Sequence, residues 1–138
     1  MRFQLATTVA AVALAVTGCT TTTTDSDGPK FEGEQEDIVR VVDALAQAGT
    51  RHDAEKICTE ILAKQLVTEL KDAGGDCVTE MDRAISDASD YDLQVTSVKI
   101  TGPNATAQVR QGKDGEVATF TFVKEGGGWR ASALGSGS

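Results

Sequence analysis

Residues 117–134, VATFTFVKEGGGWRASAL, decide the fold of this chain. Ala118, Phe120 and Phe122 alternate with valine or threonine, and this period of two predicts a β-strand with one buried face. The glycine triplet at 126–128 predicts a tight turn into a second strand over residues 129–134. The stretch therefore predicts an antiparallel hairpin.

The same period of two extends upstream to residue 91 and predicts a four-stranded antiparallel meander. Turns at residues 102–104 and 112–115 separate the earlier strands. In the first strand, Leu93 and Val95 occupy odd positions, whereas Val98 and Ile100 occupy even ones. A β-bulge near residues 96–97 would return all four side chains to one face, and bulges curve a sheet.

Before residue 91 the apolar period is 3.6 and predicts three helices. The first begins at Glu34 and stops at Gly49, and Asp53 is placed to cap a second helix, which continues through a kink to residues 74–75. Asp76 is placed to cap the third. The expected fold class is α+β, with three N-terminal helices packed on a curved four-stranded antiparallel sheet.

The alternation also assigns the two faces of the sheet. The side chains expected to face inward are apolar: Ala107, Val109, Ala118, Phe120, Phe122, Trp129, Ala131 and Ala133. Val117, Thr119, Thr121 and Val123 are expected on the outer face, where a semi-apolar patch predicts an association surface.

The chain begins with Arg2 and an apolar run from Leu5 to Val16, which is too short to span a bilayer and predicts a secretory signal. The sequence LAVTGC at 14–19 resembles the bacterial lipobox. This resemblance implies that residues 1–18 are removed and that Cys19 carries a lipid. The protein would then be anchored at the extracytoplasmic face of the cell membrane. An ordinary secretory signal without a lipid is the alternative.

Composition indicates the segments of the rest of the chain and the kinds of partner that are disfavoured. Residues 19–33 are rich in threonine and predict a stalk, residues 34–134 are long enough for one domain, and residues 135–138 are a polar tail. Asp and Glu number 21 against 13 Lys and Arg, so nucleic acid and anionic lipid headgroups are disfavoured as partners. Aromatic residues make up only 4%, which argues against a stacking platform.

Once Cys19 is assigned to the lipid, Cys58 and Cys77 remain as a pair on the oxidising side of the membrane. We predict that they form a disulfide. A zinc site would need three or four ligands, and the only other candidate is the lone His52. No Cys-x-x-Cys motif is present, so a reactive redox pair is also disfavoured.

The order of these elements resembles the nuclear transport factor 2-like (cystatin-like) superfamily, most closely its small lipoproteins from high-GC Gram-positive bacteria. The features that carry the resemblance are Val41–Ala48 with its short link to Asp53, Cys58, Leu66–Leu70 leading to Gly74–Cys77, and Phe120–Phe122 followed by Gly127–Arg130. The resemblance covers residues 34–134. It implies a cone-shaped roll around a pocket, and a superfamily that includes both enzymes and non-catalytic binding modules.

The residues favour a binding module over an enzyme. Catalytic members place Asp, Tyr or His side chains on inward faces, and the inward positions here are apolar. His52 lies in a link between helices, and we interpret it as an exposed turn residue. We assign no catalytic residue, no metal site and no cofactor. The candidate pocket or its mouth comprises Asp90, Tyr91, Asp92, Phe120, Phe122 and Trp129, with Asp87 nearby.

The expected function is therefore that of a lipid-anchored, non-catalytic domain. It would bind a small apolar molecule in its pocket or an envelope protein through the outer sheet face, where a homodimer could also form. Two alternatives stay open. One is a small isomerase or hydrolase that uses Tyr91 with Asp90 or Asp92, and the other is a passive spacer at the cell envelope.

Overall fold

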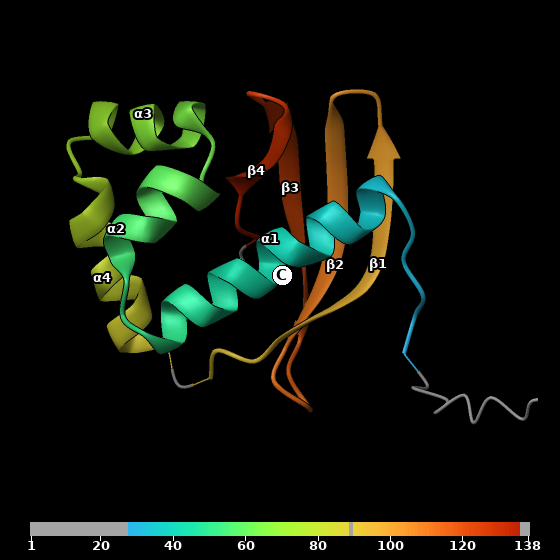
Figure 1. Ribbon diagram of the computed structural model, residues 1–138. Helices are drawn as coiled ribbons and strands as arrows, with labels where there is room; N and C mark the ends of the chain where they lie inside the picture. Colours follow the sequence, from blue (N-terminus) through green and yellow to red (C-terminus); the bar gives the residue numbers. More distant parts are fainter. Residues whose placement is uncertain (1–27, 89, 136–138) are drawn as a thin grey trace, which may run out of the picture.

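The computed structural model describes residues 28–88 and 90–135. The predicted signal, Cys19, most of the stalk and the last three residues of the tail lie outside the described residues. Within them the chain forms an α+β fold with four α-helices and one four-stranded antiparallel sheet (Figure 1). The elements are α1 (Glu34–Thr50), α2 (Ala54–Lys56), the π-helical turn η1 (Ile57–Ile61), α3 (Lys64–Asp72), α4 (Cys77–Asp87), β1 (Leu93–Thr101), β2 (Asn104–Gln111), β3 (Val117–Glu125) and β4 (Gly128–Ala133).

The sheet is the predicted meander, in the order β1-β2-β3-β4. Between β1 and β2 the register shifts from Val95 to Ser97, so Thr96 is the extra residue of a β-bulge. Because of this bulge, Val98 and Ile100 pack against the same core as Val95. The bulge predicted from the odd-to-even switch is confirmed.

The helices pack against the inner, apolar face of the sheet and along one of its edges. Ile38 and Val42 of α1 are buried where the helix crosses that face, while the other helices lie beyond the β4 edge (Figure 1). All the residues expected to face inward are buried or half-buried except Ala133, which is exposed. In the described part of the chain, no helix is long and apolar enough to cross a membrane.

The expectation for Ala133 was wrong because β4 carries a second bulge. Thr121 pairs with Ala133, but Phe122 pairs with Ala131, so Ser132 is an extra residue. The phase of β4 therefore reverses after Ala131, and Ala133 joins the outer face with Thr121.

The expected count of three helices was also wrong, because the second predicted helix is two separate pieces. Leu62 and Ala63 are extended, and Leu62 forms an isolated parallel bridge with Ala131. The amide of Ala63 donates to the Ala131 carbonyl at 2.8 Å. The amide of Lys64 then donates to the carboxylate of Glu125 at 3.2 Å. This bond satisfies the first free amide of α3, which begins at Lys64 as a separate helix. The helix is interrupted because the β4 edge offers a backbone bond to Ala63 and the Glu125 side chain at the end of β3 accepts the next amide.

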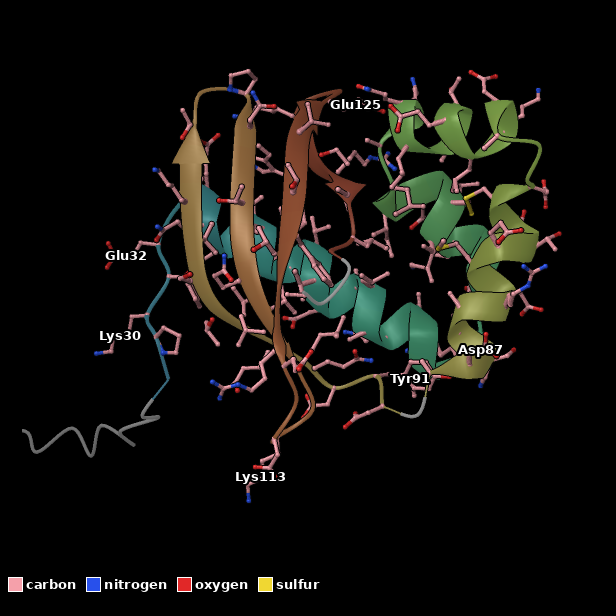
Figure 2. All side chains as sticks on the ribbon, turned by 180° about the vertical axis from the view of Figure 1, so that it is seen from behind. Lys30, Glu32, Asp87, Tyr91, Lys113 and Glu125 are labelled. Carbon is pink, nitrogen blue, oxygen red and sulfur yellow. A yellow bond between two sulfur atoms is a disulfide. The ribbon has the colours of Figure 1, made fainter. Side chains whose placement is uncertain are left out.

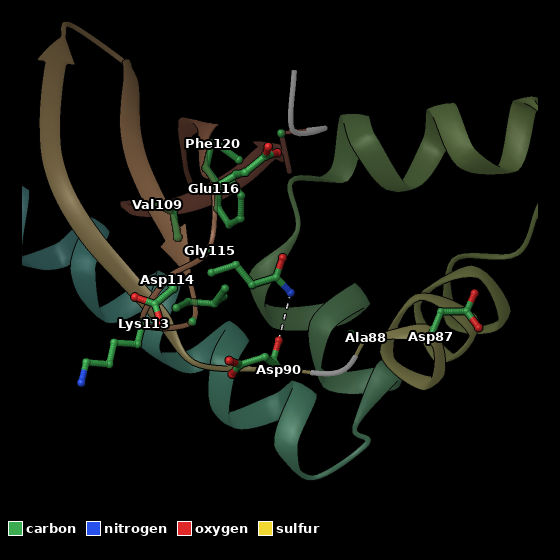
Figure 3. A pocket seen from close by; sticks show the side chains of 14 residues that line it. Asp87, Ala88, Asp90, Val109, Lys113, Asp114, Gly115, Glu116 and Phe120 are labelled. Atoms are coloured by element: carbon green, nitrogen blue, oxygen red, sulfur yellow. Dashed lines mark hydrogen bonds between the residues drawn. The ribbon is translucent and has the colours of Figure 1, made fainter.

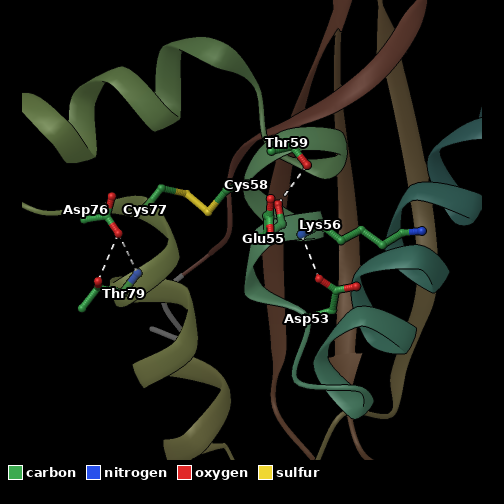
Figure 4. Close-up of a disulfide and its surroundings, with 8 residues drawn as sticks. All are labelled: Asp53, Glu55, Lys56, Cys58, Thr59, Asp76, Cys77 and Thr79. Carbon is green, nitrogen blue, oxygen red and sulfur yellow. Dashed lines mark hydrogen bonds between the residues drawn. A yellow bond between two sulfur atoms is a disulfide. The ribbon is translucent and has the colours of Figure 1, made fainter.

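The predicted disulfide joins Cys58 of η1 to Cys77, the first residue of α4 (Figure 4). Both flanking caps are present as predicted. The Asp53 carboxylate accepts the amide of Lys56 at 3.0 Å, and the Asp76 carboxylate accepts the amide of Thr79 at 3.1 Å. The bridge therefore fixes α4 to the helical turn that borders β4.

Replacing both cysteines, Cys58→Ala with Cys77→Ala, should lower the free energy of unfolding by about 3 kcal/mol, because a closed loop of this length restricts the unfolded chain. Urea unfolding followed by circular dichroism measures the change. The reduced wild-type protein serves as the control and should match the double variant. Unfolding midpoints that coincide for the oxidised wild type and the double variant would contradict a stabilising role.

Candidate functional site

A cleft exists on the inner side of the sheet because β3 is longer than β4. β4 pairs only with Thr121–Glu125, so the first part of β3, from Val117 to Phe120, has a strand neighbour on one side only. Asp87 and Ala88, at the end of α4, line the far side of the space beside it. The difference in strand length thus leaves a hollow where a longer β4 would lie.

The cleft has a volume of about 920 Å³ and an apolar floor. Leu93, Val109, Ala118 and Phe120 form that floor. The walls come from the end of α4 on one side and from the β2–β3 hairpin on the other, and the residues they contribute are Asp87, Ala88, Asp90 and Gln111–Glu116 (Figure 3). Gly135 completes the lining.

A second hollow, which we call the chamber, adjoins the cleft. Its volume is about 290 Å³, and most of its lining is apolar. The chamber lies between α1, η1, α4 and the start of β1, with Leu45, Ile57, Met81, Ile85, Tyr91 and Leu134 in its lining. Four residues line both spaces: Ala88, Asp90, Leu93 and Gln111.

The segment from Asp90 to Asp92 is bound to the end of β2 along the border of the two hollows. The Gln111 side-chain amide donates to the Asp90 carbonyl at 2.9 Å, as the dashed line in Figure 3 shows. The Gly112 amide donates to the Asp92 carbonyl at 2.7 Å. Gly112 has φ +70°, a backbone conformation that favours glycine, and a Cβ there would lie 2.5 Å from the Asp90 carboxylate.

Tyr91 joins three elements near the chamber. Its hydroxyl donates to the Ile85 carbonyl of α4, and its ring packs against Gly49 at the end of α1. His52 meets the same ring edge-on, with centroids 6.0 Å apart. Figure 2 shows Tyr91 and Asp87 close together at the end of α4. Because a backbone carbonyl binds its hydroxyl, Tyr91 acts here as a structural contact between helices and sheet.

The structure places Asp92 apart from the other two polar residues predicted at the helix–sheet junction. Asp90 lines both the cleft and the chamber, and Tyr91 lines the chamber. Asp92 instead lines a different hollow, beside Phe31. The side chains of Asp90, Tyr91 and Asp92 therefore do not converge on one space.

Of the three aromatic residues predicted to line the pocket, only one lies in the cleft. Phe120 contributes to the floor of the cleft. Phe122 and Trp129 are 1% and 6% exposed, belong to the core and line neither the cleft nor the chamber. Trp129 packs under the ammonium group of Lys124, 5.4 Å from its ring centroid, and Lys124 in turn pairs with Glu34 of α1. The contacts among Trp129, Lys124 and Glu34 connect α1 to the β3–β4 hairpin.

The charged side chains around the cleft are mostly acidic. Asp90 and Glu116 line the cleft, whereas Lys113 points outward from the hairpin tip (Figure 3). Asp87 stands apart at the end of α4, and Asp114 lies in the hairpin. Across residues 28–88 and 90–135, no group of three or more His, Cys, Asp or Glu side chains is arranged to hold a metal ion.

Among the residues that line the cleft, Phe120 of the floor and Asp90, with Asp87 nearby, of one wall were named from the sequence. The opposite wall was not named, because Gly112 was assigned only to a turn and Gln111 and Glu116 were given no role. One available signal was the unequal length of the last two predicted strands, because nine residues facing six leave part of the longer strand without a neighbour.

Comparison of the chain with protein-family models, curated proteins and solved structures finds no match in any of the three. The resemblance to the nuclear transport factor 2-like superfamily therefore stays a prediction.

Replacing Gly49 by alanine should destabilise the protein by about 1–3 kcal/mol, because its Cβ would lie 2.8 Å from Cδ1 of Tyr91. Glycine-to-alanine changes within helices ordinarily stabilise by about 1 kcal/mol, so the sign of the effect is diagnostic. Thermal unfolding measures it. The exposed neighbour change Gln47→Ala is the control and should have little effect. A Gly49→Ala protein more stable than wild type would show that the Tyr91 ring is not held against α1.

Proposed function

We propose that this chain is a lipid-anchored, non-catalytic binding module at the extracytoplasmic face of the membrane, and that the cleft between β3 and α4 is its binding site. The observation that carries the proposal is the cleft itself. It offers about 920 Å³ above an apolar floor, on the side of the sheet that faces the helices. Small-molecule sites are typically concave and combine apolar side chains with polar groups, and this cleft sets polar walls around its apolar floor.

The lipobox-like sequence at 14–19 supports the anchor, and the disulfide between Cys58 and Cys77 is in keeping with an oxidising compartment. A bulged four-stranded sheet with a helix across one face is compatible with a cone-shaped roll of the nuclear transport factor 2-like type. We keep that finer fold assignment as part of the proposal.

The arrangement of polar groups favours binding over catalysis. A general base must lie within hydrogen-bond reach of its substrate and of the groups that assist it. Asp90 and Tyr91 share the chamber but Asp92 lines a different space, and the Tyr91 hydroxyl already donates to a backbone carbonyl. An isomerase or hydrolase built on these three residues is therefore the weaker alternative, and a passive spacer leaves the cleft without a role.

A second candidate, association through the outer sheet face, has one observation in its favour. Val117 is 41% exposed, and Thr119, Thr121 and Val123 continue the same row along β3. Such a row could contact an envelope protein or a second copy of the chain.

The neutral, apolar dye Nile red should bind the oxidised domain of residues 25–138 saturably and gain fluorescence. Ala118→Trp should abolish this binding, because Ala118 is half-buried in the cleft floor and a large ring there fills the space.

Val117→Trp is the matched control, because it adds the same side chain to the same strand on the opposite face. It should leave dye binding unchanged. Equal dye binding by wild type and Ala118→Trp, or none by wild type, would contradict a ligand site in the cleft.

Replacing Cys19 by serine in the full-length chain should move the protein from the membrane fraction to the soluble fraction, because the anchoring lipid is attached to that thiol. Fractionation of bacteria fed a palmitate analogue measures both location and labelling. Thr20→Ser is the control and should stay anchored and labelled. A Cys19→Ser protein that remains labelled in the membrane would contradict the lipid anchor.

A further inference from the structure

The chamber is lined by large apolar side chains that the fold leaves only half-buried. Leu45, Met81 and Leu134 pack against the core, yet they are half-buried and line the hollow. Ile57 and Ile85, which are 2% and 6% exposed, add apolar surface from η1 and α4. Protein interiors are close-packed, so a hollow of about 290 Å³ beside the core leaves surface that an apolar ligand would cover favourably.

The lining offers little to a polar ligand, because its polar side chains already have partners. Among the described residues that line the chamber, the polar side chains are those of Asp90, Tyr91 and Gln111. The Tyr91 hydroxyl donates to a backbone carbonyl of α4, and the Gln111 side-chain amide donates to the carbonyl of Asp90. The Asp90 carboxylate in turn accepts the amide of Asp92 at 2.8 Å. An uncharged apolar ligand suits this lining, because burying a polar group without a new partner costs free energy.

The volume of the chamber sets the size of the ligand. An apolar cavity of about 150 Å³ accepts benzene. At about 290 Å³, the chamber has room for a benzene ring with a short alkyl branch. Met81, with its flexible thioether, and Leu134, which follows the last residue of β4, are the lining side chains best able to adjust to such a ligand.

We propose that the chamber is a second ligand site, separate from the cleft, and that it takes a compact, uncharged hydrocarbon group the size of an alkylbenzene. Met81 contacts this group from α4, and Leu134 limits its length. The site goes beyond the proposed function because it does not depend on the cleft floor. Neither Met81 nor Leu134 lines the cleft.

Met81 is the only methionine of residues 25–138, so the oxidised domain labelled with carbon-13 at the methionine methyl group reports on this side chain alone. Toluene should shift the Met81 methyl signal saturably, because the ring current of a bound aromatic molecule acts on nearby nuclei. Benzoate has nearly the same shape. It should bind at least about tenfold more weakly, because its carboxylate would enter an apolar lining without a partner.

Ala46→Trp should weaken toluene binding at Met81 by at least about tenfold, because Ala46 is a half-buried residue of the lining and a large ring there occupies the chamber. Gln47→Trp is the matched control. It adds the same side chain to the next residue of α1, which is exposed and outside the lining, and should bind toluene as the wild type does. Circular dichroism checks that both variants fold.

A second variant tests the site by enlarging it. Leu134→Ala should raise the affinity for n-butylbenzene relative to toluene about fourfold, which is the gain from burying one more methylene group. Ile100→Ala is its control, because Ile100 is also a half-buried apolar residue packed on the core but does not line the chamber. It should leave the ratio of the two affinities unchanged, and an unchanged ratio in Leu134→Ala would overturn the role of Leu134.

Failure of this site and failure of the proposed function give different results. A saturable Met81 shift that persists in Ala118→Trp, in which the cleft floor is filled, would support the chamber site whether or not Nile red binds in the cleft. A shift that Ala118→Trp abolishes, that folded Ala46→Trp leaves unchanged, or that the wild type does not show would overturn the chamber site. Equal affinities for toluene and benzoate would overturn the uncharged class of ligand.

Discussion

The short backbone contact between Ala63 and Ala131 is the constraint on which the rest of this structure depends. It holds the helices against β4 by pairing an otherwise open sheet edge with the extended residues Leu62 and Ala63. The same contact interrupts the second predicted helix and sets where α3 begins. It also fixes η1, and through the Cys58–Cys77 disulfide it fixes α4 relative to the sheet.

The cleft follows from this arrangement. In the middle of β4 the helices are bound to the sheet by Ala63 and by the Arg130 side chain, which donates to the Thr59 carbonyl at 2.9 Å. At the other end of the helical layer, Tyr91 connects α4 and α1 to the segment entering β1. Between these two attachments β4 ends while β3 continues, and the uncovered inner face becomes the cleft floor. Acidic side chains on the flanking loops and an apolar chamber behind them give the cleft its chemical character.

Sequence alone predicted the features that depend on local chemistry. The phase switch between Val95 and Val98 predicted the Thr96 bulge, the cap residues Asp53 and Asp76 marked two helix starts, and two remaining cysteines predicted their bridge. The break after Leu62 was missed because Ile57–Leu70 has a continuous helical period, and the interruption is imposed by a bond to Ala131, far along the chain. The Ser132 bulge was missed because the small residues of β4 give no clear apolar phase. The site shows the same division: alternation predicted its floor, whereas its walls depend on where α4 lies relative to β3.

The most direct test of the central claim, that the cleft is the binding site, is an amide chemical-shift map of the isotopically labelled domain during titration with Nile red. The account predicts that the shifts concentrate at Leu93, Val109, Gln111, Ala118 and Phe120, and that outer-face residues such as Thr106 stay unperturbed. Shifts that concentrate on the outer face, or that are absent from the cleft, would contradict it.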